Sequence, residues 1–231
     1  MTIMRILLML LAAGMAALPV HAQNSDANQG TLGGGIGVSA PIGDFDKTWG
    51  RNMFKVGAQL AYPLRRVPIL QVGFSFGLSM MGKKGADVPI TSNVLADTTG
   101  ELSTRCRVFS YHPLMRLSPL RGRVRPYVDG MVGFRQFSTT TQVTAQGAEE
   151  ELSKERNETD VAFSKGWAAG VQVTLGRLAY AEVRVERFDS GEATYVDPAS
   201  ITVSDQGAVG FSTLTSNTDV VNVLFGVGLR F

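Results

Sequence analysis

The last twelve residues, 220–231, constrain the fold more than any other part of the sequence. They read V-V-N-V-L-F-G-V-G-L-R-F, so that apolar residues recur at every second position from Val221 to Phe231. A period of two predicts a β-strand with one wholly apolar face. We expect lipid to cover that face, as it does in a transmembrane barrel, and the first strand of the chain to pair with the strand's edge.

The first 22 residues have the pattern of a secretory signal peptide. Arg5 precedes an apolar stretch from Ile6 to Val20, and Val20-His21-Ala22 has the small-x-small pattern of a cleavage site. This predicts a cleaved signal peptide over 1–22, a short periplasmic segment over 23–29 and a barrel over 30–231. No later apolar run reaches the roughly 18 residues of a helical span, so a membrane passage would use strands.

Composition and local motifs exclude several classes of function. The chain has 22 basic and 20 acidic residues, a balance that gives no global field for nucleic acid. Its single cysteine, Cys106, cannot form an intramolecular disulfide. The acidic run at 149–160 lacks calcium-loop spacing, and the glycines at 33–35 lack the Gly-Lys-Ser/Thr ending of a phosphate-binding loop. We therefore expect no metal and no cofactor.

The alternation seen in 220–231 recurs along the chain. We read 102–117 as the least regular segment, with Arg105 and Arg107 facing inward and a bulge near Pro113. The polar stretches 81–101, 138–160 and 189–219 are predicted to be long loops that alternate with short turns. Together these features predict an all-β, eight-stranded antiparallel up-and-down transmembrane β-barrel with short periplasmic turns and longer extracellular loops. The seven further predicted strands are 30–40, 53–62, 69–80, 102–117, 126–137, 161–175 and 178–188.

Four motifs resemble the outer-membrane β-barrel domain family, the OmpA-like transmembrane barrel superfamily of Gram-negative bacteria. They are G-V-S-A-P-I-G-D-F (37–45), R-P-Y-V-D-G-M-V-G-F (125–134), G-W-A-A-G-V-Q-V (166–173) and F-G-V-G-L-R-F (225–231). The resemblance implies an outer-membrane location among lipids and lipopolysaccharide, export by the Sec route, and insertion by the barrel-assembly machinery. That machinery reads the last strand, and we expect no C-terminal peptidoglycan-binding domain after it. The assembly signal would lie in Phe225, Gly226, Val227, Leu229 and Phe231.

Charged residues fall on the predicted inward face. An eight-stranded barrel is only wide enough for side chains to fill it, so these charges must pair or meet water. We expect a charge-paired plug; a gated, porin-like path for ions or small solutes stays open as an alternative. The predicted lumen network is Lys55, Arg105, Arg107, Asp129, Arg135, Glu182, Arg184, Glu186 and Arg230.

No residue pattern predicts catalysis. A lipid A-modifying hydrolase would need a Ser-His pair near the lipid interface. His112 is followed by Pro113 and Leu114, with no serine beside it, and is predicted to be an interfacial strand residue. Belts of aromatic residues are predicted at the two interfaces, with Tyr62, Tyr127, Tyr180 and Phe231 on the periplasmic side and Phe54, Phe134, Phe137 and Phe188 on the outer side.

The sequence thus predicts a non-enzymatic outer-membrane protein with a structural or surface-interaction role and an unknown surface ligand. The alternatives are a narrow channel, a lipid A-modifying enzyme and a secreted soluble barrel. The short connections carry six arginines that we expect to face inner-leaflet headgroups. These are Arg65, Arg66, Arg121, Arg123, Arg125 and Arg177.

Overall fold

The structure is a computed structural model that describes most of the chain after the predicted signal peptide. It describes residues 29–92, 95–120, 122–145, 151–197, 200, 202–203 and 209–231. Within these ranges, side chains are described for 29–82, 105–120, 122–140, 159–197, 200 and 210–231. The predicted signal peptide (1–22) and residues 23–28 of the predicted periplasmic segment lie outside the described residues.

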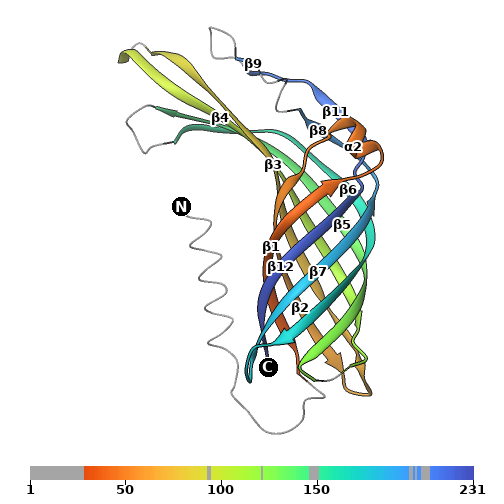
Figure 1. The fold of residues 1–231 in the computed structure, drawn as a ribbon. Helices are drawn as coiled ribbons and strands as arrows, with labels where there is room; N and C mark the ends of the chain where they lie inside the picture. Colours follow the sequence, from red (N-terminus) through yellow and green to blue (C-terminus); the bar gives the residue numbers. More distant parts are fainter. Residues whose placement is uncertain are drawn as a thin grey trace.

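Eight antiparallel strands close into a barrel in the order β1-β12-β7-β6-β5-β4-β3-β2 (Figure 1). The closing seam pairs the first and last strands along their whole length, from Thr31 opposite Arg230 to Pro41 opposite Val220. The predicted eight-stranded antiparallel up-and-down barrel is therefore confirmed. The strands are β1 (Thr31–Pro41), β2 (Met53–Leu64), β3 (Val67–Ser92), β4 (Leu95–Leu117), β5 (Val124–Ala145), β6 (Glu151–Thr174), β7 (Ala179–Ser190) and β12 (Val220–Arg230).

Apolar side chains cover the outside of the barrel and polar side chains fill the inside. On β12, Phe225 and Val227 are 61% and 65% exposed, while Asn222 between outward neighbours is fully buried. An apolar exterior around a polar lumen is the arrangement of bacterial outer-membrane barrels, because lipid rather than water contacts the outer wall. The protein therefore lies in the outer membrane of a Gram-negative bacterium, and the soluble-barrel alternative is wrong.

No helix among the described residues is long and apolar enough to cross a membrane.

Two of the predicted long loops are strands, which corrects the sequence interpretation. The stretch 81–101 continues β3 and β4 as a hairpin that pairs through to Ser92 opposite Leu95. The stretch 138–160 continues β5 and β6, and β4 stays paired with β5 as far as Gly100 opposite Ala145. These strands project beyond the barrel wall as a four-stranded extension, made of 83–92, 95–104, 138–145 and 151–159, which leans away from the barrel (Figure 1). The extension lies beyond the part of the wall that lipid covers, so no bilayer imposes apolar alternation there and the pattern that marked the other strands is missing.

The other extracellular connections also contain regular structure. The first holds the helix α2 (Asp44–Thr48), between Gly43 and Gly50, whose φ angles of 63° and 60° suit glycine. The third predicted loop, 189–219, holds a hairpin of β8 (Glu192–Val196) with β11 (Thr213–Asn217). It also holds the two-residue strands β9 (Thr202–Val203) and β10 (Val209–Gly210).

The phase predicted for 102–117 is wrong, and so is the bulge predicted there. Burial alternates without a break along 105–117, the part of β4 whose side chains are described, so that Arg105 and Arg107 face outward and Cys106 and Val108 face inward. The register with β3 is continuous from Leu117 to Arg107. Below these arginines the outward residues are apolar, so Arg105 and Arg107 lie where the wall leaves the hydrocarbon and an outward charge can be hydrated.

We predict that Phe225→Arg lowers the free energy of unfolding from lipid vesicles by about 2–4 kcal/mol, because the side chain points into hydrocarbon near the middle of β12. Urea unfolding in vesicles measures this change. The matched control is Phe211→Arg, in the extracellular connection, which should change the free energy by less than about 0.5 kcal/mol. Equal effects of the two substitutions would contradict a lipid-facing outer wall.

Candidate functional site: the charged lumen and its cap

The lumen contains the buried charged side chains of the described residues. Each of them is at most 7% exposed. They come from opposite sides of the wall, on β2, β4, β5, β7 and β12, and meet because the barrel is narrow. The cations are Lys55, Arg116, Arg135, Arg184 and Arg230, and the carboxylates are Asp129, Glu182 and Glu186.

Asp129 accepts hydrogen bonds from two guanidinium groups. Arg116 binds it in a bidentate manner, with Nε 2.7 Å from Oδ1 and Nη2 3.0 Å from Oδ2. The Nη1 atom of Arg184 donates to the same Oδ2. The Arg116 guanidinium also lies 3.8 Å from the ring centroid of Tyr127, whose hydroxyl accepts a 3.2 Å hydrogen bond from Arg184. A single fully buried carboxylate therefore fixes two arginines.

Glu186 is the second centre of the network. Its Oε2 accepts from Lys55 Nζ at 2.6 Å and from Asn222 Nδ2 at 3.0 Å. Its Oε1 accepts from Arg184 Nε at 2.7 Å. Arg184 thus donates to both Asp129 and Glu186. One continuous set of interactions therefore joins five residues of β2, β5, β7 and β12, namely Lys55, Asp129, Arg184, Glu186 and Asn222.

Glu182 is held by amides. Its two oxygens accept from Gln59 Nε2 and from Gln172 Nε2, the latter at 2.8 Å. The side-chain amide oxygen of Gln59, Oε1, accepts in turn a hydrogen bond from Arg116 Nη2 at 2.6 Å. Gln59 therefore connects Glu182 to the Asp129 cluster, and the polar network extends across the barrel from β2 to β6.

Two further cations and the histidine lie above and below these clusters. Arg135 Nη1 donates to the Thr218 carbonyl at 2.5 Å toward the extracellular end. Arg230 Nη1 donates to Thr174 Oγ1 at 2.5 Å toward the short turns. His112 is 1% exposed and stacks on Phe188, with 4.3 Å between ring centroids. The prediction of an interfacial histidine is wrong, because β4 turns this side chain into the lumen.

The sequence located part of this network. The structure joins Lys55, Asp129, Glu182, Arg184 and Glu186, places Arg135 and Arg230 at the two ends of the lumen, and places Arg105 and Arg107 outside. Arg116, Gln59, Gln172 and Asn222 were missed. Each of these four residues stands at an inward position in the alternation of its strand, and that position could have identified it as a lumen residue from the sequence. Of the eight predicted belt residues, Tyr127, Tyr180, Phe137 and Phe188 are wrong, because each is at most 3% exposed and faces inward. Tyr62, Phe54 and Phe134 do lie on the outer wall, where they are 54%, 48% and 47% exposed.

Glycines face the long charged side chains across the lumen. Gly33, Gly35, Gly57 and Gly226 line one hollow together with Glu182, Arg184 and Glu186. A methyl group on Gly57 would stand 3.0 Å from the side chain of Leu224, and one on Gly77 would stand 3.1 Å from Lys55 Cε. Inward glycines thus leave the space that long side chains from neighbouring strands fill.

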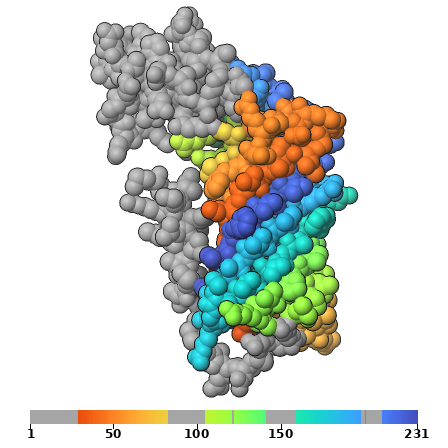
Figure 2. All heavy atoms as spheres, in the orientation of Figure 1, coloured from red at the N-terminus to blue at the C-terminus, as the bar shows by residue number. Residues whose placement is uncertain are grey.

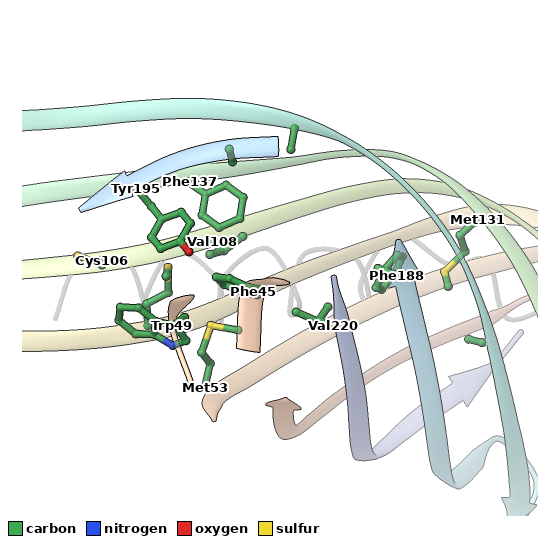
Figure 3. Close-up of a cluster of buried hydrophobic side chains, with 14 of the residues drawn as sticks. Phe45, Trp49, Met53, Cys106, Val108, Met131, Phe137, Phe188, Tyr195 and Val220 are labelled. Atoms are coloured by element: carbon green, nitrogen blue, oxygen red, sulfur yellow. The ribbon is translucent and has the colours of Figure 1, made fainter. Parts of the chain in front are cut away.

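An apolar cluster closes the extracellular end of the lumen (Figure 3). Phe45 of α2 is fully buried and packs edge-on against Tyr195 of β8 and Phe137 of β5, with centroid distances of 5.4 and 6.4 Å. Trp49 also contacts Tyr195 edge-on, at 6.3 Å. We call this cluster the cap; α2, in the orange segment of Figure 2, lies at the end of the barrel from which β3 and β4 project in Figure 1. Its members are Phe45, Trp49, Met53, Cys106, Val108, Phe137, Tyr195, Val196 and Val220.

The Cys106 thiol lies in the cap, above the lipid-facing part of β4. It is 2% exposed, and its Sγ is 3.4 Å from Thr139 Oγ1 and 3.9 Å from the Val196 carbonyl. Burial raises the pKa of Cys106, which further lowers the fraction of reactive thiolate. The thiol is therefore a reporter of whether the cap is closed.

Among the described residues, no group of three or more His, Cys, Asp or Glu side chains could hold a metal ion.

We predict that Asp129→Asn destabilises the barrel by about 3–5 kcal/mol, because it leaves two buried guanidinium groups without their shared carboxylate. Urea unfolding in vesicles measures the loss. Asp189→Asn is the control, since its ion pair with Arg187 is about half exposed and should contribute less than about 1 kcal/mol. A similar small effect at both positions would show that the lumen is hydrated enough to solvate the arginines.

We also predict that Phe45→Ala exposes the Cys106 thiol, because the deleted ring packs at the centre of the cap. Maleimide labelling of the folded protein should be slow in the wild type and at least tenfold faster in the variant, since such a deletion costs about 3–5 kcal/mol of packing. Lys47→Ala, on the exposed face of the same helix, is the control and should leave labelling slow. Fast labelling of the wild type would show that the cap is open.

Comparisons with known proteins find similarity in structure alone. No protein-family model matches the chain, and no curated protein matches it. Solved structures with similar chain courses include OprG from Pseudomonas aeruginosa, at 15% identity and a TM-score of 0.48 over 89% of this chain and 96% of that one. Ail, the attachment invasion locus protein of Yersinia pestis, aligns at 14% identity and 0.42 over 88% and 99%. The N-terminal barrel domain of OprF from Pseudomonas aeruginosa aligns at 14% and 0.36 over 88% and 99%.

At these values no ligand, activity or partner transfers from those proteins to this chain. The fold rests on the chain's own strand pairing, which closes eight antiparallel strands at a β1–β12 seam. With its apolar exterior and charged lumen, the chain has the fold of an eight-stranded outer-membrane barrel, which is the fold that the resemblance in its motifs implied.

Proposed function

We propose that this protein is a closed outer-membrane scaffold that displays its extracellular strands to a ligand at the cell surface. The observation that carries the proposal is that the lumen is filled by a paired polar network and covered by the cap. Material could pass only if both were rearranged. The part of the molecule left to act is the extracellular end, with the extension, α2 and the β8–β11 hairpin.

The energetics of the network favour a fixed plug over a gated path. Opening the lumen would separate Lys55 from Glu186 or an arginine from Asp129, and an unpaired charge in a site this buried costs several kcal/mol. The cap adds an apolar barrier above the charges. These two layers support a structural scaffold over the alternative of a narrow channel.

The extension supplies the interaction surface. Strand β2 leaves β3 at Phe54 opposite Met80, and beyond that point β3 pairs with β4 alone among the described residues. On the other side β8 runs beside β6, with Gly191 N 2.8 Å from the Phe163 carbonyl. The outer edge of β3 therefore presents backbone donors and acceptors that an extended segment of a partner could pair with.

We assign no catalysis to this protein. His112 faces the lumen against Phe188, where a lipid substrate on the outer wall does not reach it. His112 therefore does not supply the base that the lipid A-modifying alternative needs at the lipid interface. As partners we propose the Sec and barrel-assembly machinery, outer-membrane lipids including lipopolysaccharide, and a surface ligand that meets the extension; the last strand, with Phe225 and Phe231, would be the assembly signal.

We predict that the purified protein gives no reproducible opening steps in planar bilayers, because the network and the cap both obstruct the lumen. Single-channel recording in about 1 M KCl measures this. A variant with 83–104 replaced by a short Gly-Ser turn should be equally closed, since every cap residue among the described side chains lies outside 83–104. Regular conductance steps from the wild type would overturn the scaffold and favour the channel.

A further inference from the structure

The short-turn end of the barrel carries a hollow lined by four arginines. Arg123 lies in the turn before β5 and Arg125 at the start of β5. Arg177 lies in the β6–β7 turn and Arg230 at the end of β12. The structure thus divides the six turn arginines of the sequence. Three of the six, Arg123, Arg125 and Arg177, line the hollow together with the lumen residue Arg230. Arg65 and Arg66 lie in the β2–β3 turn outside it, and Arg121 lies outside the described residues.

Backbone hydrogen bonds hold the walls of this hollow in place. Thr174 N donates to the Arg123 carbonyl at 2.8 Å, and Arg230 N donates to the Leu178 carbonyl at 2.7 Å. Arg125 Nε donates to the Gly122 carbonyl at 3.0 Å. The Arg230 guanidinium is 2% exposed, bonds to Thr174 Oγ1 and lies 5.2 Å from the ring centroid of Tyr180. Backbone hydrogen bonds therefore fix the main chain at Arg123 and Arg230, and hydrogen bonds hold the side chains of Arg125 and Arg230.

The residues that line the hollow give it a positive charge, which would favour binding of an anion. Its residues include four guanidinium groups and, among the described residues, no carboxylate. Guanidinium groups present several N–H donors in a planar fork that matches the oxygens of a phosphate. Glu182, the lumen carboxylate nearest in sequence to this end of β7, is engaged by Gln59 and Gln172. A phosphate group is the ligand chemistry that fits.

The surroundings of the hollow favour a phosphate attached to a lipid. Leu175 lines the hollow itself and is 59% exposed, and Leu120, Val124 and Leu178 are each more than half exposed near the same turns. Short turns mark the periplasmic end of an outer-membrane barrel, where the inner leaflet consists of phospholipid. A ligand with a phosphate headgroup and acyl chains would satisfy the arginines and the leucines together.

We propose that this hollow binds the headgroup of an anionic phospholipid of the periplasmic leaflet. The guanidinium groups bind the phosphate oxygens, and the acyl chains lie along the apolar outer wall beside Leu175 and Leu178. This site does not depend on what the extracellular end binds or on whether the lumen conducts. It tethers the short-turn end of the barrel to one class of lipid.

Native mass spectrometry of the folded protein, titrated in detergent with phosphatidylglycerol, tests the proposal. The double variant Arg123→Gln/Arg177→Gln should bind the first phosphatidylglycerol roughly 25-fold more weakly than the wild type, at about fivefold per guanidinium lost. The control Arg65→Gln/Arg66→Gln removes the same charge from another short turn and should change the affinity less than twofold. Both pairs lie in exposed turns, and heat-modifiable gel migration checks that each variant is folded.

Two parallel titrations separate the sources of the phosphate. Phosphatidylethanolamine should bind the wild type at least fivefold more weakly than phosphatidylglycerol, and inorganic phosphate should not compete at lipid-equivalent concentration. Equal losses in the two double variants would overturn the hollow as a specific site. Inorganic phosphate that bound as tightly as the lipid would overturn the lipid assignment. If Arg123→Gln/Arg177→Gln does not fold, Arg177→Gln alone gives the same comparison against Arg66→Gln.

Discussion

The structure depends on how a few charges are kept in a narrow space that lipid surrounds. Moving an ion pair out of water costs several kcal/mol per ion, and only close, multiply bonded geometry recovers that cost. Asp129 meets this condition by accepting from Arg116 and Arg184, and Glu186 meets it by accepting from Lys55, Arg184 and Asn222. Because these residues come from β2, β4, β5, β7 and β12, satisfying the charges also fixes the strands around the barrel. The inward glycines are part of the same solution, because they leave the space that the long side chains occupy.

Most of the barrel could be predicted from sequence because the bilayer imposes a strict rule. Where lipid touches the wall, every outward residue must be apolar, so β1, β2, β3, β5, β6, β7 and β12 show their inward face by alternation alone. The rule stops at the membrane boundary. Arg105 and Arg107 stand just beyond it on β4, so their charge no longer indicates the inward face, and the phase inferred from them was wrong. Arg116, nearer the short turns, was the inward arginine of that strand.

The regular structure outside the membrane gave no such signal. The extension lies beyond the lipid-covered wall, so the bilayer does not require an apolar face there and the strands of 83–104 and 138–159 resemble loops in sequence. The cap depends on contacts between Phe45, Phe137 and Tyr195, which are far apart in the chain and meet only through the fold. Likewise, pairing of Asp129 with particular arginines cannot be read from alternation, which shows the face of a strand but not the height at which side chains meet.

The unequal strand lengths have a mechanical consequence. In the barrel order, β4 and β5, which carry the extension, lie diametrically opposite the β1–β12 seam where the sheet closes. A partner that pulls on the extension therefore loads the hydrogen bonds of β3 to β6 along the strand direction, in shear, while the seam on the far side of the wall bears little of the force. The barrel can thus act as a tension-bearing post in the membrane whose point of closure is shielded from the load.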